Sequence, residues 1–258
     1  MPRLPTNPRE LDVFCSDRAI AAATGDGAIL CRILGCKPFY VSSQDRWMNP
    51  HLVIGGVWES PLTCFLTRLV PPGWKWADVG ANVGYYSVLL SELSPDGYGI
   101  AYEPDPIAFD LLKTNVRING CRNVHCVRAG VGAVYRHSFT FHLSTDNIGG
   151  ASVHKSPYVE DAADEFSAEV LTLASPHEFD IVKIDAEGED LPIVLSWPTM
   201  PKHTVIEYAG KFKHVPDLLP ALFDKCHVQL LDEEGNARET TIDEVRPLDV
   251  ATLYLQPR

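Results

Sequence analysis

The glycine-rich segment from Asp78 to Gly84 has the residue types of a ligand-binding turn. It reads Asp-Val-Gly-Ala-Asn-Val-Gly and begins inside a short apolar run. Gly80 lets the backbone turn and approach a ligand without a Cβ atom, and Gly84 lets the next helix pack closely. In open α/β sheets, such a strand-to-helix turn is where nucleotide-like ligands bind. The segment therefore predicts a ligand of this kind at residues 78–84.

A carboxylate at the end of the next apolar run can bind a sugar. The two oxygens of Glu103 suit the two hydroxyls of a ribose. The alternative is that Asp78 and Glu103 only cap the helices that follow them. A dinucleotide-binding G-x-G-x-x-G pattern starting at Gly80 is excluded, because Asn82 and Tyr85 occupy its other glycine positions. A phosphate-binding P-loop is excluded as well, because no Gly-Lys-Ser/Thr follows. We therefore expect an adenosine-containing ligand without a pyrophosphate.

Charged residues also follow a later apolar run, in the segment Lys183 to Gly188. Lys183 and Asp185 are two positions apart, so on a strand they share one face and can form an ion pair. Asp185 and Glu187 are candidates to accept a proton, and Glu207, at the end of the next run, can converge on the same edge. Structural alternatives exist. Lys183 could be a strand residue that reaches solvent, and Glu187 could cap the helix that begins near Asp190. Glu207 could satisfy backbone groups.

His154 is a further candidate base. It follows a polar, glycine-containing loop expected at residues 145–152 and would act if that loop folded over the cleft. The alternative is a solvated loop histidine. A divalent metal held by Asp185 with other carboxylates is conceivable, but no metal-ligand motif supports it, so we expect no metal.

Alternating apolar runs and amphipathic stretches from Trp76 onward predict strand-helix-strand units around a mostly parallel sheet. Two late strands are expected to pair antiparallel at one sheet edge. The strands expected from these runs are 76–80, 98–102, 124–128, 179–184, 204–208, 228–231 and 251–255. The helices expected between them are 83–93, 107–118, 190–195 and 215–223.

The remaining segments are less regular. Residues 138–142 alternate polar and apolar types, which predicts a half-exposed strand with Phe139 and Phe141 on its buried face. Residues 158–169 are acidic and are expected at the surface. Residues 1–50 are interpreted as an N-terminal extension or lid, and residues 51–258 as one catalytic domain.

Composition restricts the class of partner. The 258 residues are 45% hydrophobic and 22% charged, which is typical of a soluble globular domain. The net charge of −12 disfavours nucleic acid and anionic membranes and favours a neutral or cationic small molecule. No signal peptide or membrane-spanning run is recognisable. The seven cysteines lack a Cys-x-x-Cys pair, which indicates reduced thiols in a cytoplasmic protein, with an isolated disulfide as the alternative.

Three segments closely resemble the FkbM-type methyltransferase family, whose members depend on S-adenosylmethionine. They are residues 78–86, residues 102–106 and the Lys-Ile-Asp-Ala-Glu-Gly segment 183–188. The resemblance extends upstream to 56–59 and downstream to 205–207, so it covers about residues 55–210. It implies a class I, Rossmann-like α/β fold with a mostly parallel seven-stranded sheet and an antiparallel edge.

The resemblance also implies roles for individual residues. Glu103 would bind the ribose of S-adenosylmethionine, and Gly130 would lie near the adenine. Glu59 would approach the amino group of the donor, although capping a helix is the alternative. Tyr85 and Tyr86 would line the cleft or pack in the core. The full set of implied donor-binding residues is Glu59, Asp78, Gly80, Ala81, Asn82, Gly84, Tyr85, Glu103, Pro104, Gly130 and Asp185.

Methyl transfer is an in-line displacement, so the main task is to place the acceptor atom against the methyl carbon. A hydroxyl acceptor also needs a base. We expect O-methylation of a small molecule or sugar-containing metabolite, such as a natural product, by a monomer or homo-oligomer. The alternatives are N-methylation, a nucleotide-binding module without catalysis, a nucleotide-dependent oxidoreductase and an RNA 2′-hydroxyl methyltransferase.

Overall fold

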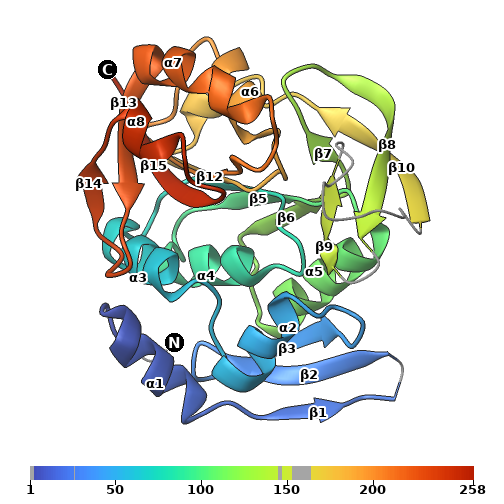
Figure 1. Cartoon of the computed structure of the whole chain (residues 1–258). Helices are drawn as coiled ribbons and strands as arrows, with labels where there is room; N and C mark the ends of the chain where they lie inside the picture. Colours follow the sequence, from blue (N-terminus) through green and yellow to red (C-terminus); the bar gives the residue numbers. More distant parts are fainter. Residues whose placement is uncertain (1–2, 26, 145–146, 153–163) are drawn as a thin grey trace.

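The structure is a computed structural model that describes residues 3–25, 27–144, 147–152 and 164–258. Its centre is an eight-stranded sheet with the order β14-β13-β15-β12-β11-β4-β5-β6 (Figure 1). The five strands from β12 to β6 are mutually parallel, whereas β15 runs antiparallel to both β12 and β13. The strands in sheet order are β14 (Ala237–Glu239), β13 (Cys226–Leu231), β15 (Ala251–Pro257), β12 (His203–Tyr208), β11 (Ile181–Ile184), β4 (Trp76–Val79), β5 (Gly99–Tyr102) and β6 (Val124–Val127).

Helices cover both faces of this sheet. On one face lie α3 (Ser60–Leu69), α4 (Tyr85–Leu93) and α5 (Pro106–Ile118), and on the other lie α6 (Asp190–Ser196) and α7 (Val215–Lys225) (Figure 1). Each face has its own hydrophobic core. Because β4 and β11 lie between these cores, all four residues of each strand are buried. The carboxyl ends of the parallel strands therefore meet at one rigid edge. A 3-10 turn, η2 (Pro176–Glu178), precedes β11, and α8 (Ile242–Val245) precedes β15.

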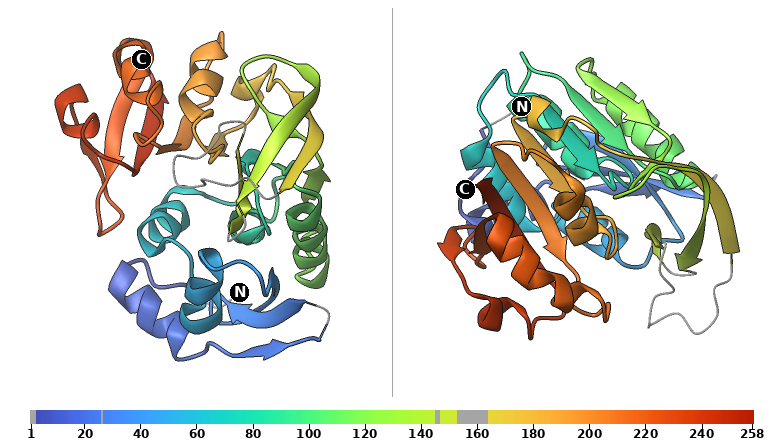
Figure 2. Two further views of the ribbon diagram at one scale, coloured as in Figure 1. Left: turned by 45° about the vertical axis from the view of Figure 1, so that its right-hand side comes forward. Right: turned by 90° about the horizontal axis from the view of Figure 1, so that it is seen from above.

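The N-terminal residues form a small layer of their own. It contains α1 (Pro8–Ser16), a three-stranded antiparallel sheet, α2 (Met48–Pro50) and a π-helix, η1 (His51–Gly55). The strands of this sheet are β1 (Ala21–Ala23), β2 (Ala28–Ile33) and β3 (Lys37–Ser42). Figure 2 shows the layer against the α4 and α5 side of the molecule, and its buried residues belong to the same hydrophobic core as those helices.

One buried amide joins this layer to the glycine turn. The Asn115 side chain on α5 donates to the carbonyl oxygens of Tyr40 and Val83, both at 2.8 Å. Its own oxygen accepts from the Tyr40 N–H at 2.7 Å. Asn115 is completely buried, so these hydrogen bonds fix β3 relative to the start of α4.

A second, four-stranded unit projects from the main sheet next to β6 (Figure 2). Its order is β7-β10-β8-β9, from β7 (Gly130–Val131), β10 (Asp164–Leu171), β8 (Arg136–Ser144) and β9 (Asn147–Ser152). Its strands pair antiparallel except for β7 and β10, which are parallel. One prediction was wrong here, because β9 lies within the expected loop 145–152. Strand β10 begins within the acidic stretch 158–169, and the exposed side chains of Glu165 and Glu169 agree with the surface position expected for it. The expected strand 138–142 is confirmed within β8, with Phe141 buried and Phe139 half-buried.

The predicted mostly parallel sheet with an antiparallel edge is confirmed, with one difference. An eighth strand, β14, pairs with β13 through a tight turn at Gly235 and extends the edge. The described residues include all seven cysteines, and every one is a free thiol, so the disulfide alternative is wrong. Among the described residues, no helix has the length and apolar character needed to cross a bilayer.

Candidate active site

The turn between β4 and α4 requires glycine at position 80. Gly80 has a φ of +71°, and a Cβ atom on it would lie 1.8 Å from the carbonyl oxygen of Asp185. The N–H groups of Gly80 and Ala81 donate to the carbonyl oxygen of Tyr102 at 3.1 and 2.9 Å. The turn is therefore held between the ends of β5 and β11, where a side chain at position 80 has no space.

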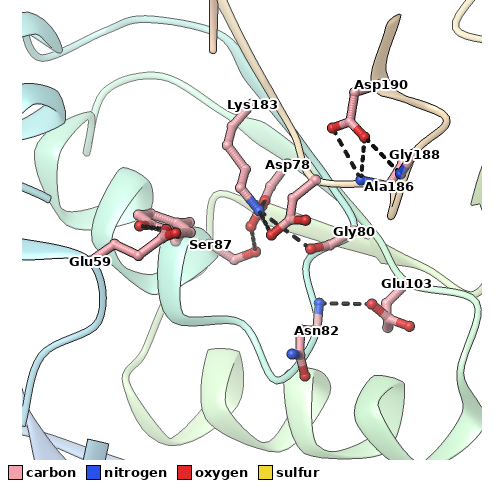
Figure 3. Close-up of polar contacts among 12 residues, drawn as sticks. Glu59, Asp78, Gly80, Asn82, Ser87, Glu103, Lys183, Ala186, Gly188 and Asp190 are labelled. Atoms are coloured by element: carbon pink, nitrogen blue, oxygen red, sulfur yellow. Dashed lines mark hydrogen bonds and ion pairs between the residues drawn. The ribbon is translucent and has the colours of Figure 1, made fainter. Parts of the chain in front are cut away.

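Glu103 stands beside this turn as a buried carboxylate. It is 3% exposed and accepts a hydrogen bond from the Asn82 N–H at 2.7 Å (Figure 3). It also accepts one from the Asp105 N–H at 2.8 Å. Burial raises the pKa of Glu103 to about 8. Helix α5 is capped by Asp105, which accepts from the N–H groups of Ile107 and Ala108. The capping alternative for Glu103 is therefore wrong.

Asp78 and Lys183 form a buried polar group beneath the turn. Asp78 is completely buried and accepts from the Ser87 hydroxyl at 2.6 Å, so it does not cap α4 (Figure 3). The Lys183 Nζ atom lies 3.4 Å from Asp185 Oδ2, the contact expected from their spacing, and 3.7 Å from Asp78 Oδ1. Burial lowers the pKa of Lys183, but Asp185 and Asp78 raise it by more. Lys183 therefore stays charged and does not reach solvent.

A first cavity, of about 340 Å³, lies over the ends of β4, β5 and β11. Its polar wall contains Gly80, Glu103 and Asp185, and its apolar wall comes largely from the projecting four-stranded unit. The predicted residues Pro104 and Gly130 also line it. Its apolar side consists of Val131, Ala133, Val134, Phe139, Phe141 and Val170. An apolar slot beside a buried carboxylate suits a nucleoside, with the base in the slot and the ribose at Glu103.

A second cavity, of about 170 Å³, lies on the other side of Gly80. It shares Gly80, Asp185 and Glu187 with the first cavity, so the two cavities meet at these residues. Its lining combines carboxylates with aromatic side chains. Besides the shared residues, the lining consists of Trp47, Met48, Trp58, Glu59, Ala81, Asn82, Tyr85, Tyr86, Lys183 and Glu207.

Four carboxylates surround the second cavity, and their partners differ. Glu59 occupies the N-cap position of α3, but its side chain makes no capping hydrogen bond, so the capping alternative is wrong. Its carboxylate instead accepts a hydrogen bond from the Tyr86 hydroxyl at 2.5 Å. Glu187 lies 3.5 Å from the Lys211 ammonium. Burial raises the pKa of Glu59 and of Glu187, and it raises that of Glu207 well above its usual range, with neighbouring carboxylates adding to each shift.

Backbone strain is concentrated at the same place. Four non-glycine residues in the described ranges have a positive φ, and three of them line the second cavity. These are Glu59 at +41°, Asn82 at +49° and Glu187 at +48°. Such conformations cost about 1–3 kcal/mol each and persist where the surrounding structure fixes them, often at functional sites.

Some predicted residues lie behind the cavity walls or outside the described residues. Asp78 is shielded by the turn, and Gly84 packs against Leu112 of α5 at the start of α4. Tyr85 is 1% exposed, and its hydroxyl lies 3.1 Å from Thr63 Oγ1, so most of its ring belongs to the core. His154 lies outside the described residues.

Other site residues were not predicted from the sequence. Trp47, Met48 and Trp58 come from the N-terminal layer, whose elements showed no periodic pattern. Trp58 lies in the segment 56–59, which resembles the family, and this resemblance was the one sequence signal that it belongs to the site. Lys211 follows β12 and pairs with Glu187. Asp190, at the start of α6, accepts from the N–H groups of residues 186 and 188 and holds the loop after β11 in place.

Comparison with known proteins gives one family match and several similar structures. The model of the methyltransferase FkbM domain matches residues 78–249. A TehB-like SAM-dependent methyltransferase from Corynebacterium glutamicum is 15% identical, with 83% of this chain and 95% of that chain covered and a TM-score of 0.48. TYW2 from M. jannaschii in complex with AdoMet is 13% identical, with 92% and 87% covered and a TM-score of 0.47. No curated protein matches the sequence.

The site fits S-adenosylmethionine on several counts. Glu103 offers acceptors for a ribose, and four carboxylates offer negative charge for a sulfonium. The buried Oδ1 atom of Asn82 has no hydrogen-bond partner among the described residues, which suits a ligand that brings a donor such as an amino group. The family match covers more than half of the chain and includes all of these residues except Glu59. The chain therefore belongs to the FkbM methyltransferase family, has a class I methyltransferase fold, and uses S-adenosylmethionine as its methyl donor.

Proposed function

We propose that the protein methylates a hydroxyl group of a small-molecule or sugar-containing acceptor. The observation that carries this proposal is the meeting of two cavities at Gly80, Asp185 and Glu187. One cavity has the features of a nucleoside site, and the other is lined by carboxylates and aromatic rings. A donor in the first cavity would present its sulfur at the junction, and an acceptor in the second would meet it there.

S-adenosylmethionine supplies a methyl group on a positively charged sulfur. In this proposal Glu103 binds the ribose hydroxyls, and the apolar wall with Phe139 and Phe141 holds the adenine. Asn82 and Glu59 face the amino group, and Asp185 lies beside the sulfur. Asp78 and Lys183 are positioning residues, because they orient Asp185 and the turn from beneath without lining the first cavity.

The second cavity supports a hydroxyl acceptor with a polar body. Trp47 and Trp58 offer apolar faces on which a ring can stack, while Glu187 and Glu207 can accept hydrogen bonds from hydroxyls. A hydroxyl must lose its proton during transfer, and a cluster of carboxylates provides a place for it. The same carboxylates repel phosphates, so a polyanionic acceptor such as RNA is disfavoured.

The test is an acceptor panel of sugars, hydroxylated aromatic compounds, primary amines and a short RNA. Formation of S-adenosylhomocysteine and a methyl mass gain on the acceptor are measured for wild-type protein and Asp185→Asn. We expect a hydroxylated compound to be methylated, with turnover reduced by at least about tenfold in Asp185→Asn and donor binding retained. Methylation of amines or RNA alone would contradict the proposed acceptor class. Donor binding without turnover on any acceptor would support a module without catalysis.

A further inference from the structure

The carboxylate of Glu207 differs from its neighbours in having nothing to neutralise it. Asp185 lies against Lys183, Glu187 lies against Lys211, and Glu59 accepts from a tyrosine hydroxyl. In the described part of the chain, no hydrogen bond or ion pair reaches the Glu207 carboxylate. Because Glu207 lines the second cavity, the missing partner can come from whatever occupies that cavity.

The position of Glu207 follows from the strand register. Ile184 on β11 is the partner of Ile206 on β12, so Asp185 and Glu207 follow as neighbours at the carboxyl ends of two parallel strands. On its other side, Glu207 is the partner of Thr252 on β15, which carries no charge. The acids that face Glu207 from the surrounding elements are Glu59 on the α3 side, Asp185 and Glu187 after β11, and Asp190 on α6. Lys183 on β11 also lines the second cavity with Glu207.

Lys183 pairs with Asp185 and Asp78, so the acids dominate the surroundings of Glu207, and burial adds to their effect. The pKa of Glu207 is raised well above its usual range, first by burial and then by Asp185, Glu187, Asp190 and Glu59. Without a ligand, burial and the neighbouring acids therefore favour the protonated form of Glu207. A positive charge brought into the junction of the two cavities opposes both effects and favours the ionised carboxylate.

Resting on the proposed function, we infer that Glu207 releases its proton when the positively charged donor binds and takes up the acceptor proton when the methyl group is transferred. In the transfer, a bond forms between the acceptor oxygen and the methyl carbon. The carbon–sulfur bond breaks, and its electron pair goes to sulfur. The hydroxyl proton goes to Glu207, and the demethylated donor is left without its sulfonium charge. Glu207 is then neutral again. The proton that it gains replaces the positive charge that the sulfur loses, so the net charge of the site is unchanged.

This coupling has a measurable signature without any acceptor. Calorimetric titrations at pH 6.5, in buffers of different ionisation enthalpy, count the protons released on binding. At this pH the amino groups of both ligands are protonated. We expect S-adenosylmethionine to release up to one proton more per site than S-adenosylhomocysteine. Sinefungin, in which an amine replaces the sulfonium, should behave like S-adenosylmethionine. The ratio of the two Kd values should change by up to tenfold per pH unit in favour of S-adenosylmethionine as the pH rises.

Two variants make the test specific. Glu207→Gln should abolish the difference in proton release and flatten the pH dependence of the Kd ratio. Glu178→Gln, the same chemical change in an exposed residue of η2 at the opposite end of β11, should leave both unchanged. Glu207→Asp, which restores a carboxylate, should restore part of the difference, and circular dichroism checks that each variant is folded.

The possible failures are distinguishable. Equal proton release by the two ligands, or a difference that persists in Glu207→Gln, would overturn the coupling while leaving donor binding intact. If neither S-adenosylmethionine nor S-adenosylhomocysteine bound to the wild-type protein, the proposed function would be overturned together with the inference.

Discussion

Individual acids in this site are buried before any ligand is present, and Glu103 is the clearest case. Its carboxylate is fixed by two backbone N–H groups and faces the first cavity. A carboxylate that is already oriented loses little freedom when it binds a ribose, so its hydrogen bonds contribute fully to affinity. Burial increases affinity in this way but lowers the stability of the folded chain, because it disfavours the charged form of the carboxylate. Glu103 therefore favours binding at the expense of folding.

The effect on binding is tested by Glu103→Gln, which keeps the shape of the side chain and removes its charge. Hydrogen bonds to charged groups contribute about 1.5–3 kcal/mol, so the Kd for S-adenosylhomocysteine should rise about tenfold to a hundredfold. Isothermal titration at about pH 9, where Glu103 is ionised, gives the Kd, and Glu178→Gln is the control. An unchanged Kd in Glu103→Gln would remove the ribose-binding assignment.

The effect on stability has a definite sign. The pKa of Glu103 is raised by burial from 4.5 to about 8, so between these pH values the folded chain holds a proton that the unfolded chain has lost. The stability linked to this proton is complete below pH 4.5 and is lost as the pH rises to about 8, by at most about 1.4 kcal/mol per pH unit. Urea unfolding from pH 5 to 8 should show a steeper loss for wild-type protein than for Glu103→Gln. Parallel curves would contradict the assignment.

At the scale of elements, two turns at the ends of neighbouring parallel strands form the junction of the cavities. The turn after β4 passes so close to the end of β11 that Gly80 lies against the Asp185 backbone. Moving either turn would displace both a donor-binding residue and Asp185. The β4–α4 turn and the loop after β11 therefore act as one unit.

Gly80→Ala tests this close packing against a matched glycine. Gly73 also has a positive φ, of +91°, but a Cβ atom on it would meet nothing within 4 Å. Gly73→Ala should therefore cost only the backbone penalty of about 1–2 kcal/mol. Gly80→Ala adds a clash with the Asp185 carbonyl and should cost several kcal/mol more and abolish binding of S-adenosylhomocysteine. Similar unfolding free energies for the two variants would show that the turn can open.

The N-terminal layer contributes an aromatic wall to the acceptor cavity. Trp47 is 65% exposed yet lines that cavity, so Trp47→Ala should not affect folding. It should raise the KM for the acceptor about threefold to tenfold, without changing kcat or the Kd for S-adenosylhomocysteine. Tyr98→Ala, which removes an exposed aromatic ring at the start of β5, is the control. A changed donor Kd in Trp47→Ala would place this residue in the donor site instead.

The sequence predicted the elements with a strong period and missed those that depend on tertiary pairing. Strands β4, β5, β11 and β12 were predicted because each is a short apolar run followed by a helix signal. Strand β9 contains Gly149 and Gly150, which disfavour strands in isolation, and it forms by pairing with β8. Glu103, Asp185 and Glu207 were predicted from their place at strand ends, whereas Glu59 was implied only by the family resemblance. Trp47 and Lys211 were not, because no local pattern brings them to the cavity.

The whole molecule carries a net charge of −12, and the donor carries one more positive charge than its demethylated product. Long-range attraction should therefore assist the donor more than the product. Raising the ionic strength from about 0.02 M to 0.15 M shortens the screening length to about 8 Å. The Kd for S-adenosylmethionine should rise a few-fold, and that for S-adenosylhomocysteine should stay within about twofold. Equal changes would show that local contacts dominate.

The central claim is that one ligand spans the first cavity from the apolar slot to the junction with the second. A crystal structure of the protein with S-adenosylhomocysteine tests it most directly. We predict that the ribose hydroxyls bind the Glu103 carboxylate and that the sulfur lies beside Gly80 and Asp185, facing the cavity that contains Glu207. A ligand bound elsewhere, or a ribose that makes no contact with Glu103, would contradict the account.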